Sequence, residues 1–318
     1  MKTLLVLAAA LCALPGAVSA QTYPARPIHT IMTVGGGAEL VARIVAQGLA
    51  EPLGQPVVVE VQSGAGGSIG QEAVAHAAPD GYTLMFSSVS SHVAPTFLSK
   101  NVRFDPIKSY TPIAKVAESI LLIAANPKEP YSSVREMIDY ARRNPGKIAY
   151  GTSGVGTTHH FSAVMITALS GIDWVHVPYK AGPPVVTDLI TGQIQVGFVI
   201  LGTLGGYVNA GKVKVIGTNM NQRVAQFPQV PTVTEQLPGY EPPPTWLCYF
   251  GPASLPQPIV QRLYTEIMKI MRLPETHAKL EATGFVVSTG TAEDVAAMIR
   301  RDMVFFGKAV KAAGIQPE

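Results

Sequence analysis

The segment YGTSGVGTTHH, residues 150–160, concentrates side chains that could do chemistry. Glycines alternate with serine and threonine, and two histidines follow. Such a segment could cradle a phosphate, hold a catalytic serine, bind a metal ion, or offer hydrogen-bond donors to a smaller anion. Residue spacing, here and in the rest of the chain, separates these four possibilities.

A catalytic serine on a strand-to-helix turn requires the pattern G-x-S-x-G. Ser153 lies in GTSGV, residues 151–155, where the final glycine is missing. A secreted hydrolase that uses Ser153 with a nearby histidine is therefore kept only as an alternative. The segment GAGGSIG, residues 64–70, has Ile69 where a dinucleotide-binding fingerprint needs its third glycine. No Gly-Lys-Ser or Gly-Lys-Thr follows a glycine loop, which excludes a P-loop.

The histidines show no spacing that would hold a metal ion. His159 and His160 are neighbours, and successive helical residues point about 100° apart, whereas a helical metal pair is spaced i, i+4. HExxH and CxxC are absent, so the sequence predicts no metal site. Four further histidines are isolated and are interpreted as packed or surface residues: His29, His76, His92 and His176. The carboxylates of Asp80 and Asp188 form no evident acid–base pair.

The interpretation that survives is an anion-binding cleft made by two glycine-rich helix starts. The glycines at 35–37 end one predicted strand and open a helix, and residues 154–158 do the same further along. Glycine lets the backbone approach a ligand, and the free N–H groups at a helix start attract an anion. We expect Thr157 or Thr158 to cap the second helix, Ser153 to face the cleft, and both histidines merely to begin that helix. The alternative is that both are ordinary tight loops.

The pattern of elements predicts two α/β units. The first has strands at 27–34, 55–61 and 82–88 with helices between them, a βαβαβ order that predicts a parallel sheet covered by helices. A second unit begins near residue 119 and has strands at 119–126, 147–153, 174–179 and 193–200. A strand at 212–219 would return the chain to the first unit, and the remaining C-terminal third is mainly helical. We therefore expect lobe 1 to comprise 21–118 with 219–318, and lobe 2 to comprise 119–218, with a cleft between them and hinge movement at the crossover strands.

The N-terminus predicts export. A short positive start, an apolar run of about a dozen residues and a small-residue site ending at Ala20 are typical of a secretory signal peptide over residues 1–20. We expect cleavage there, and not lipidation at Cys12, because Leu11 is bulky. The mature chain would keep one cysteine, Cys248, and so no internal disulfide. Charged residues make up 14% and the net charge is +3, with no basic stripe, so we expect no nucleic-acid partner.

Several motifs occur together and in order over the expected mature chain: YPARPI, GGGAELVARIVAQGLAEPLGQPVVVE, GAGGSIGQEAVAHAAPDGYTL, NPGKIAYGTSGVGTTHH, VHVPYKAGPPVVTDLITGQI, AGKVKVIGTN and FPQVPTVTEQLPGYE. In these stretches the chain resembles the Bug family, the extracytoplasmic solute receptors of tripartite tricarboxylate transporters. The resemblance implies a two-lobed periplasmic-binding-protein fold of the Venus flytrap, type II kind. It also implies no catalysis, no cofactor, a periplasmic location, membrane transporter subunits as partners, and a small carboxylate held between the lobes partly through ordered water. We expect a monomer. A receptor that feeds a sensor kinase is a further alternative.

The resemblance also assigns candidate ligand residues. The family's pocket loops match Val34–Glu39, Ser87–His92 and Thr152–His159, and the stretch VPYK lies near the pocket. Where the family often has an aspartate this chain has Val199, which argues against a ligand ammonium group and leaves room for an apolar or aromatic body. Other departures are Met32-Thr33-Val34 in place of a proline pair, and Ala38-Glu39 in place of Thr-Asp. The candidates are Gly35, Gly36, Gly37, Ala38, Ser87, Ser88, Ser90, Thr152, Ser153, Gly156, Thr157, Thr158, Tyr179 and Val199.

Overall fold

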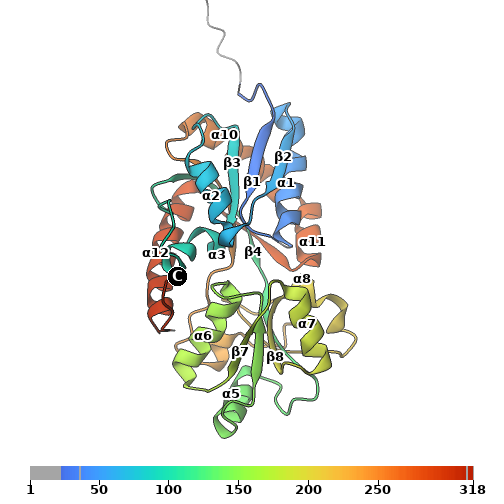
Figure 1. The fold of residues 1–318 in the computed structure, drawn as a ribbon. Coiled ribbons are helices and arrows are strands. Elements are labelled where there is room, and N and C mark those ends of the chain that lie inside the picture. The colour runs from blue at the N-terminus through green and yellow to red at the C-terminus, as the bar shows by residue number, and fades with distance from the viewer. Residues whose placement is uncertain (1–22, 36, 313, 318) are drawn as a thin grey trace, which may run out of the picture.

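The structure, a computed structural model, describes residues 23–35, 37–312 and 314–317 of the 318-residue chain. The expected signal peptide and Gly36 lie outside the described residues. The chain forms two α/β lobes, one above the other in Figure 1, each built on its own sheet. We call the part around the six-stranded sheet the first lobe and the part around the five-stranded sheet the second lobe. No helix within the described ranges combines the length and the hydropathy needed to cross a membrane.

The sheet of the first lobe is mixed. Its order is β11-β4-β10-β3-β1-β2, in which β1 is parallel to β2 and β3, while β10 is antiparallel to β3 and β4, and β11 is antiparallel to β4. The predicted parallel sheet is thus correct only for β1 to β3, because the other three strands were not predicted. The strands are β1 (Ile28–Met32), β2 (Val57–Val61), β3 (Thr83–Ser88), β4 (Tyr110–Ser119), β10 (Trp246–Pro252) and β11 (Phe285–Gly290).

The sheet of the second lobe is mixed as well, with the order β7-β6-β8-β5-β9. β6 is parallel to β7 and β8, and β5 is antiparallel to β8 and β9. All five strands were predicted, with ends that differ by at most three residues. They are β5 (Leu121–Ala125), β6 (Ala149–Thr152), β7 (Val175–Pro178), β8 (Val196–Ile200) and β9 (Lys214–Thr218).

Helices cover both sheets (Figure 1). In the first lobe they are α1 (Ala38–Leu53), α2 (Ser68–Ala75), α3 (Val89–His92), α4 (Pro95–Leu98), α10 (Gln257–Met271), α11 (Pro274–Ala282) and α12 (Ala292–Ala312). In the second lobe they are α5 (Val134–Arg143), α6 (Thr158–Ser170), α7 (Gly182–Thr191), α8 (Leu201–Leu204) and α9 (Val233–Gln236). Short 3-10 turns add Ala65–Gly67 and Gly205–Tyr207.

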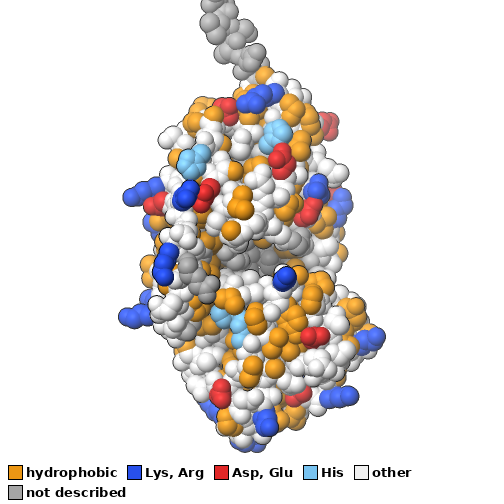
Figure 2. Space-filling model, viewed as in Figure 1, with side chains coloured by type: hydrophobic (Ala, Val, Ile, Leu, Met, Phe, Trp, Pro, Cys, Tyr) orange, Lys and Arg blue, Asp and Glu red, His pale blue; other side chains and the backbone are white. Residues whose placement is uncertain are grey.

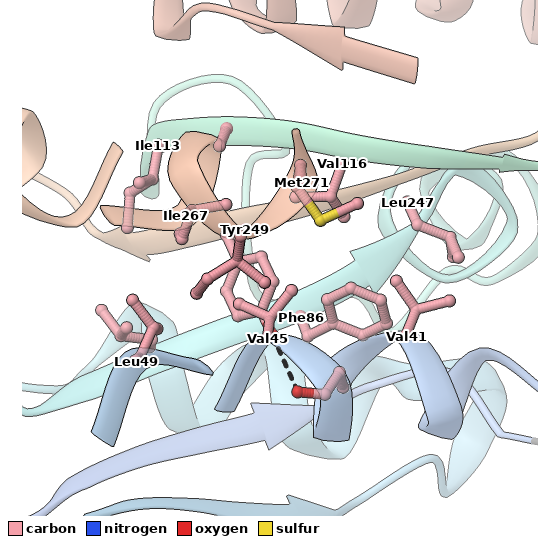
Figure 3. Close-up of a cluster of buried hydrophobic side chains, with 14 of the residues drawn as sticks. Val41, Val45, Leu49, Phe86, Ile113, Val116, Leu247, Tyr249, Ile267 and Met271 are labelled. Atoms are coloured by element: carbon pink, nitrogen blue, oxygen red, sulfur yellow. Dashed lines mark hydrogen bonds between the residues drawn. The ribbon is translucent and has the colours of Figure 1, made fainter. Parts of the chain in front are cut away.

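The core of the first lobe shows why these segments fold as they do (Figure 3). Val41, Val45 and Leu49 recur at helical spacing on α1 and are fully buried against the sheet. On the sheet, the rings of Phe86 and Tyr249 lie 5.0 Å apart between their centroids. Each such side chain contributes about 1.5–3 kcal/mol through burial, so this layer holds the start of α1 firmly at the edge of the cleft.

The chain crosses between the lobes twice. The first crossing is at Ile120, between β4 and β5. The predicted return at residue 219 is not where the packing changes, because α9 packs on the second lobe: the Val134 N–H donates to Gln236 Oε1 at 2.6 Å, and Tyr240 belongs to the second lobe's apolar core. The return runs instead through residues 241–245, which include three consecutive prolines. The exact lobe boundaries and the hinge movement stay predictions.

The lobes also touch on both sides of the crossings. A side-chain carbon at Gly156, in the second lobe, would lie 2.2 Å from Leu98 of the first lobe. At Gly202 it would lie 2.0 Å from the Thr283 carbonyl oxygen. On the outer side, the rings of Phe161 on α6 and Phe306 on α12 pack edge to face with centroids 4.8 Å apart. In this conformation these contacts set the distance between the two walls of the cleft.

Candidate functional site

A cavity of about 810 Å³ lies between the lobes and is lined by residues of both. Figure 2 shows the corresponding hollow across the middle of the molecule. The structure brings together nine of the predicted ligand residues as lining of this cavity: Gly35, Gly37, Ala38, Ser88, Ser90, Ser153, Gly156, Thr157 and Thr158. Gly36 lies outside the described residues, and four other predicted residues, taken up below, do not line the cavity.

The first wall of the cleft contains the start of α1. β1 leads into Thr33 and Gly35, and Gly37 precedes the helix without supplying a side-chain cap. The prediction that this glycine segment ends a strand and opens a helix is confirmed. Glu39 points its carboxylate at Arg43, with 2.6 Å between the two groups, on the exposed side of the helix. The helix start therefore presents backbone donors to the cleft with no side-chain cap in front of them.

Behind this wall lies a buried cluster of hydroxyl groups. Thr33 Oγ1 donates to Ser87 Oγ at 2.7 Å, and Ser91 Oγ lies 3.2 Å from Ser87 Oγ and 3.0 Å from Ser88 Oγ. Ser88 and Ser91 cap α3 reciprocally. Ser87 is fully buried and supports the wall from behind, which differs from its expected place among ligand contacts. Ser90 reaches the cavity, and among the described residues its hydroxyl has only a long 3.4 Å contact, to Ser88 Oγ.

The second wall contains the start of α6, where the hydroxyls serve the protein itself. Thr157 is the N-cap: its Oγ1 accepts from the His160 N–H at 3.3 Å and donates to the Gly154 carbonyl at 2.7 Å. Thr158 Oγ1 donates to the Pro244 carbonyl at 3.3 Å. The predictions that a threonine caps this helix and that both histidines begin it are confirmed. The expectation that these hydroxyls are available to a ligand is not met by this geometry.

Ser153 is paired with a histidine. Its Oγ lies 2.8 Å from His159 Nδ1, and both residues line the cavity, whereas we expected His159 merely to begin the helix. Burial lowers the pKa of His159 to about 4. A general base works best with a pKa near the operating pH, so this imidazole is a weak base at pH 7. Within the described residues no carboxylate is hydrogen-bonded to it, and the arrangement lacks the third group of a hydrolase triad.

Behind the second wall, aromatic rings stack and hold the loop. The rings of His160 and His176 lie 4.4 Å apart, and those of His176 and Tyr150 lie 4.9 Å apart. The Gly156 N–H donates to His160 Nδ1 at 3.2 Å, which requires that nitrogen to be unprotonated. Burial, assisted by His176, lowers the pKa of His160 to about 4. Thr152, a predicted ligand residue, is buried with its Oγ1 2.7 Å from His176 Nε2, and it therefore supports the loop from behind.

Two further predicted ligand residues face away from the cavity. The Tyr179 hydroxyl donates to Asp188 Oδ2 at 2.6 Å, and burial together with that carboxylate raises the pKa of Tyr179 to about 12. Val199 is fully buried in an apolar cluster with Leu122 and Leu189. The inference about the ligand drawn from Val199 is therefore corrected, because this side chain packs in the core and does not face the cleft.

Several lining residues were not predicted from the sequence. Ser119 ends β4 and Thr245 precedes β10, two strands that the sequence reasoning missed. The glycine turn before α2 contributes Ser63, and the first residue of α2 contributes Ser68. The run of small residues in this segment could have indicated both. Lys180, expected near the pocket, does line it. Among the described residues no group of three or more histidine, cysteine, aspartate or glutamate side chains could hold a metal ion.

Known proteins resemble this chain over most of its length. The model of a family described as the tripartite tricarboxylate transporter family receptor matches residues 41–315. A UPF0065 protein of Bordetella bronchiseptica is 30% identical, with 99% of this chain and 94% of the relative covered. Protein BugT of Bordetella pertussis is 29% identical, with 93% of this chain and 92% of the relative covered.

Solved structures agree with these matches. The periplasmic binding protein BugD has a TM-score of 0.79 at 27% identity, and an R. palustris protein with adipate has 0.82 at 28%; each comparison covers 93% of this chain and 100% of the other. MatC from Rhodopseudomonas palustris with bound malate has a TM-score of 0.77 at 26% identity, covering 91% of this chain and 100% of that one. These likenesses confirm the predicted two-lobed α/β fold.

Proposed function

Because the chain belongs to the family of tripartite tricarboxylate transporter receptors, which includes the Bug proteins, we propose that it captures a small organic carboxylate between its lobes and delivers it to a membrane transporter. The family is one of periplasmic solute receptors. We propose that this chain acts in the periplasm, as a monomer without a cofactor and without catalysis. Lobe 1 would hold residues 21–118 and the C-terminal segment, and lobe 2 the middle of the chain.

The observation that carries the proposal is one cavity whose two walls each contain a helix start. The start of α1 comes from the first lobe and that of α6 from the second, and both line the same 810 Å³ space. N–H groups at a helix start and the positive end of the helix dipole favour an anion. Two such ends facing one space from different lobes suit an anion that draws the lobes together.

The ligands of the similar structures support the carboxylate class. MatC carries malate and the R. palustris protein carries adipate, and both are carboxylates. The donors that line the cavity in this chain are mainly hydroxyl and backbone groups. A buried ion pair costs several kcal/mol of desolvation per ion, so neutral donors also favour a receptor that must release its cargo.

The test is native mass spectrometry of freshly purified protein, followed by thermal-shift titration with a panel of organic acids. We expect a retained small acid, or stabilisation by at least one acid of the panel. Hydrolysis of ester substrates that depends on Ser153, without stabilisation by any acid, would instead support the secreted hydrolase, which the 2.8 Å contact between Ser153 and His159 keeps as the alternative. Uptake of the acid that is lost in a strain without this receptor, and restored when the receptor is supplied, would separate transport from service to a sensor kinase.

A further inference from the structure

The charged side chains that line the cleft are few and of opposite sign. Among the described lining residues, Lys180 of the second lobe is the one lysine or arginine, and Glu72 on α2 of the first lobe is the one carboxylate. Neither belongs to an ion pair within the described part of the chain. Their formal charges cancel. Such a lining can accommodate one ligand carboxylate, but a second carboxylate placed near Glu72 would meet a like charge.

Exposed apolar side chains face the same cavity from both walls. Ile69, at the start of α2, is 59% exposed, and Val155, in the loop before α6, is 61% exposed. Figure 2 shows apolar side chains on both sides of the hollow and a basic one at its edge. Apolar surface gains free energy when it is covered, so an apolar ligand body between these two residues would be favoured as the lobes close on it.

Further residues that line the cavity are apolar as well. Leu98 lies against Gly156 at one place, and Ile200 and Phe285 lie 3.5 Å from where a side-chain carbon of Gly37 would be. The volume of about 810 Å³ falls in the upper part of the roughly 300–1,000 Å³ that small-molecule pockets span. The cavity therefore has room for a body much larger than the carboxylate group that the helix starts would hold.

We propose that the cleft selects a monocarboxylate with an apolar body, and that Glu72 discriminates against a second carboxylate. The proposal rests on the proposed function of carboxylate capture and names the class of carboxylate. The body lies between Ile69 and Val155, and the carboxylate lies toward the helix starts and Lys180.

The test is isothermal titration at pH 7 of extensively dialysed protein with four acids. Octanoate and cyclohexanecarboxylate present an apolar chain and an apolar ring, adipate adds a second carboxylate, and phenylalanine adds an ammonium group. We expect the tighter-binding of octanoate and cyclohexanecarboxylate to bind at least about tenfold tighter than adipate and phenylalanine. Which of these two acids binds tighter shows whether the cleft prefers an apolar chain or an apolar ring. Tighter binding of adipate or of phenylalanine overturns the proposal.

Variants test the two apolar residues directly. Ile69→Ser and Val155→Ser should each weaken binding of the better apolar acid by about tenfold, because an apolar contact on the ligand is lost. Both positions are exposed in the structure, so the variants should fold. Val304→Ser is the matched control, since Val304 is 59% exposed on α12 and does not line the cavity. Unchanged affinity in both cleft variants overturns the placement of the apolar body.

A charge variant tests the discrimination. Glu72→Gln should strengthen adipate binding by about tenfold and change binding of the apolar acid by less than about twofold, because only a second carboxylate meets Glu72. Glu51→Gln, on an exposed part of α1, is the control. Adipate affinity that does not rise in Glu72→Gln overturns the role of Glu72. If adipate binds well to the unaltered protein, or if none of the four acids binds while another acid of the thermal-shift panel does, only this inference fails. If no acid is retained and none of that panel binds, the proposed function fails and takes the inference with it.

Discussion

The two walls of the cleft are built from the same sequence pattern and end with different sets of donors. In each, a strand runs through glycines into a helix. On the first wall the residue before the helix is Gly37, which has no side chain to cap α1. On the second wall that residue is Thr157, whose hydroxyl occupies the His160 N–H and the Gly154 carbonyl. The capping residue thus decides whether all the first N–H groups of a glycine-rich helix start are free for a ligand or whether the protein itself engages one of them.

The largest expected difference between the two walls is in the stability that each loses when one of its glycines is replaced by alanine. Gly156 has φ of +77° and faces Leu98, so Gly156→Ala should lower the free energy of unfolding by about 3 kcal/mol through left-handed strain and overpacking. Gly37→Ala, at φ of −60° with its nearest contacts at 3.5 Å, should cost less than about 1 kcal/mol. Alanine adopts that backbone without strain and restricts the unfolded chain, which offsets its lower preference for the N-cap position. Chemical denaturation measures both. Equal losses of stability in the two variants would contradict the comparison. Adding Leu98→Ala to Gly156→Ala should recover only the part of the loss that comes from overpacking against Leu98, and not the part from backbone strain.

The second difference is a dependence on pH that the second wall should show. The pKa of His160 is about 4 in the folded chain because burial disfavours the charged ring, whereas an unfolded histidine titrates near 6.5. The unfolded state therefore binds the proton first, and stability is lost as the pH falls from 6.5 toward 4, by about 2 kcal/mol at pH 4.5. His160→Asn, whose side-chain oxygen can still accept from Gly156, should remove the share of this loss that His160 causes, while His159 and His92, whose pKa values burial also lowers to about 4, keep theirs. Denaturation curves at pH 7 and pH 4.5 give the answer, with the exposed His76→Asn as control.

Ligand affinity provides the third comparison. Ser90→Ala should weaken binding of the tightest acid of the panel by about tenfold, because its hydroxyl lacks a short internal partner and can donate to a carboxylate. Thr157→Ala should instead cost about 1 kcal/mol of stability and change affinity by less than about threefold, because that hydroxyl is engaged as the N-cap. Isothermal titration measures both. A larger loss of affinity in Thr157→Ala than in Ser90→Ala would reverse the assignment of the two walls.

The smallest effect on ligand affinity is expected for Tyr179, whose hydroxyl faces away from the cavity. Tyr179→Phe removes the 2.6 Å hydrogen bond to Asp188, so it should lower stability by about 1 kcal/mol. Affinity for the same acid should stay within about twofold of the unaltered protein. An affinity loss of tenfold or more in the titration would return Tyr179 to the ligand-binding residues.

Some strands were predicted from the sequence and others were not, and the reason is how far along the chain each strand pairs. β1 to β3 and the strands of the second lobe are short apolar runs bounded by turn residues, so local pattern identifies them. β4 and β10 contain prolines and pair with strands far along the chain, as in the register of Leu247 with Ser88. β11 pairs with β4 in the same way. Because such pairings are decided by tertiary contacts, local propensity does not reveal them.

Dependence on tertiary contacts also limits how well the site could be predicted from the sequence. The loops at the two helix starts were identified, because glycine runs and hydroxyls are visible in the sequence. Whether a given side chain faces the cavity depends on strand register, and a shift of one residue turns it to the other face. Val199 and Thr152 lie on strands and face the interior, and Ser119 could be placed only once β4 was known. The hydrogen bonds that engage Thr157 also depend on a folded loop.

The three prolines of the return crossing, Pro242 to Pro244, have a mechanical consequence. Each ring holds φ near −65° and removes an N–H, so this connection behaves as a semi-rigid strut along its length. The other connection is the single residue Ile120 between two strands. A one-residue connection beside a stiff one favours rotation of the two lobes about a single axis. We expect cargo binding to be converted into one reproducible displacement, a shape that a partner can recognise whatever the cargo is.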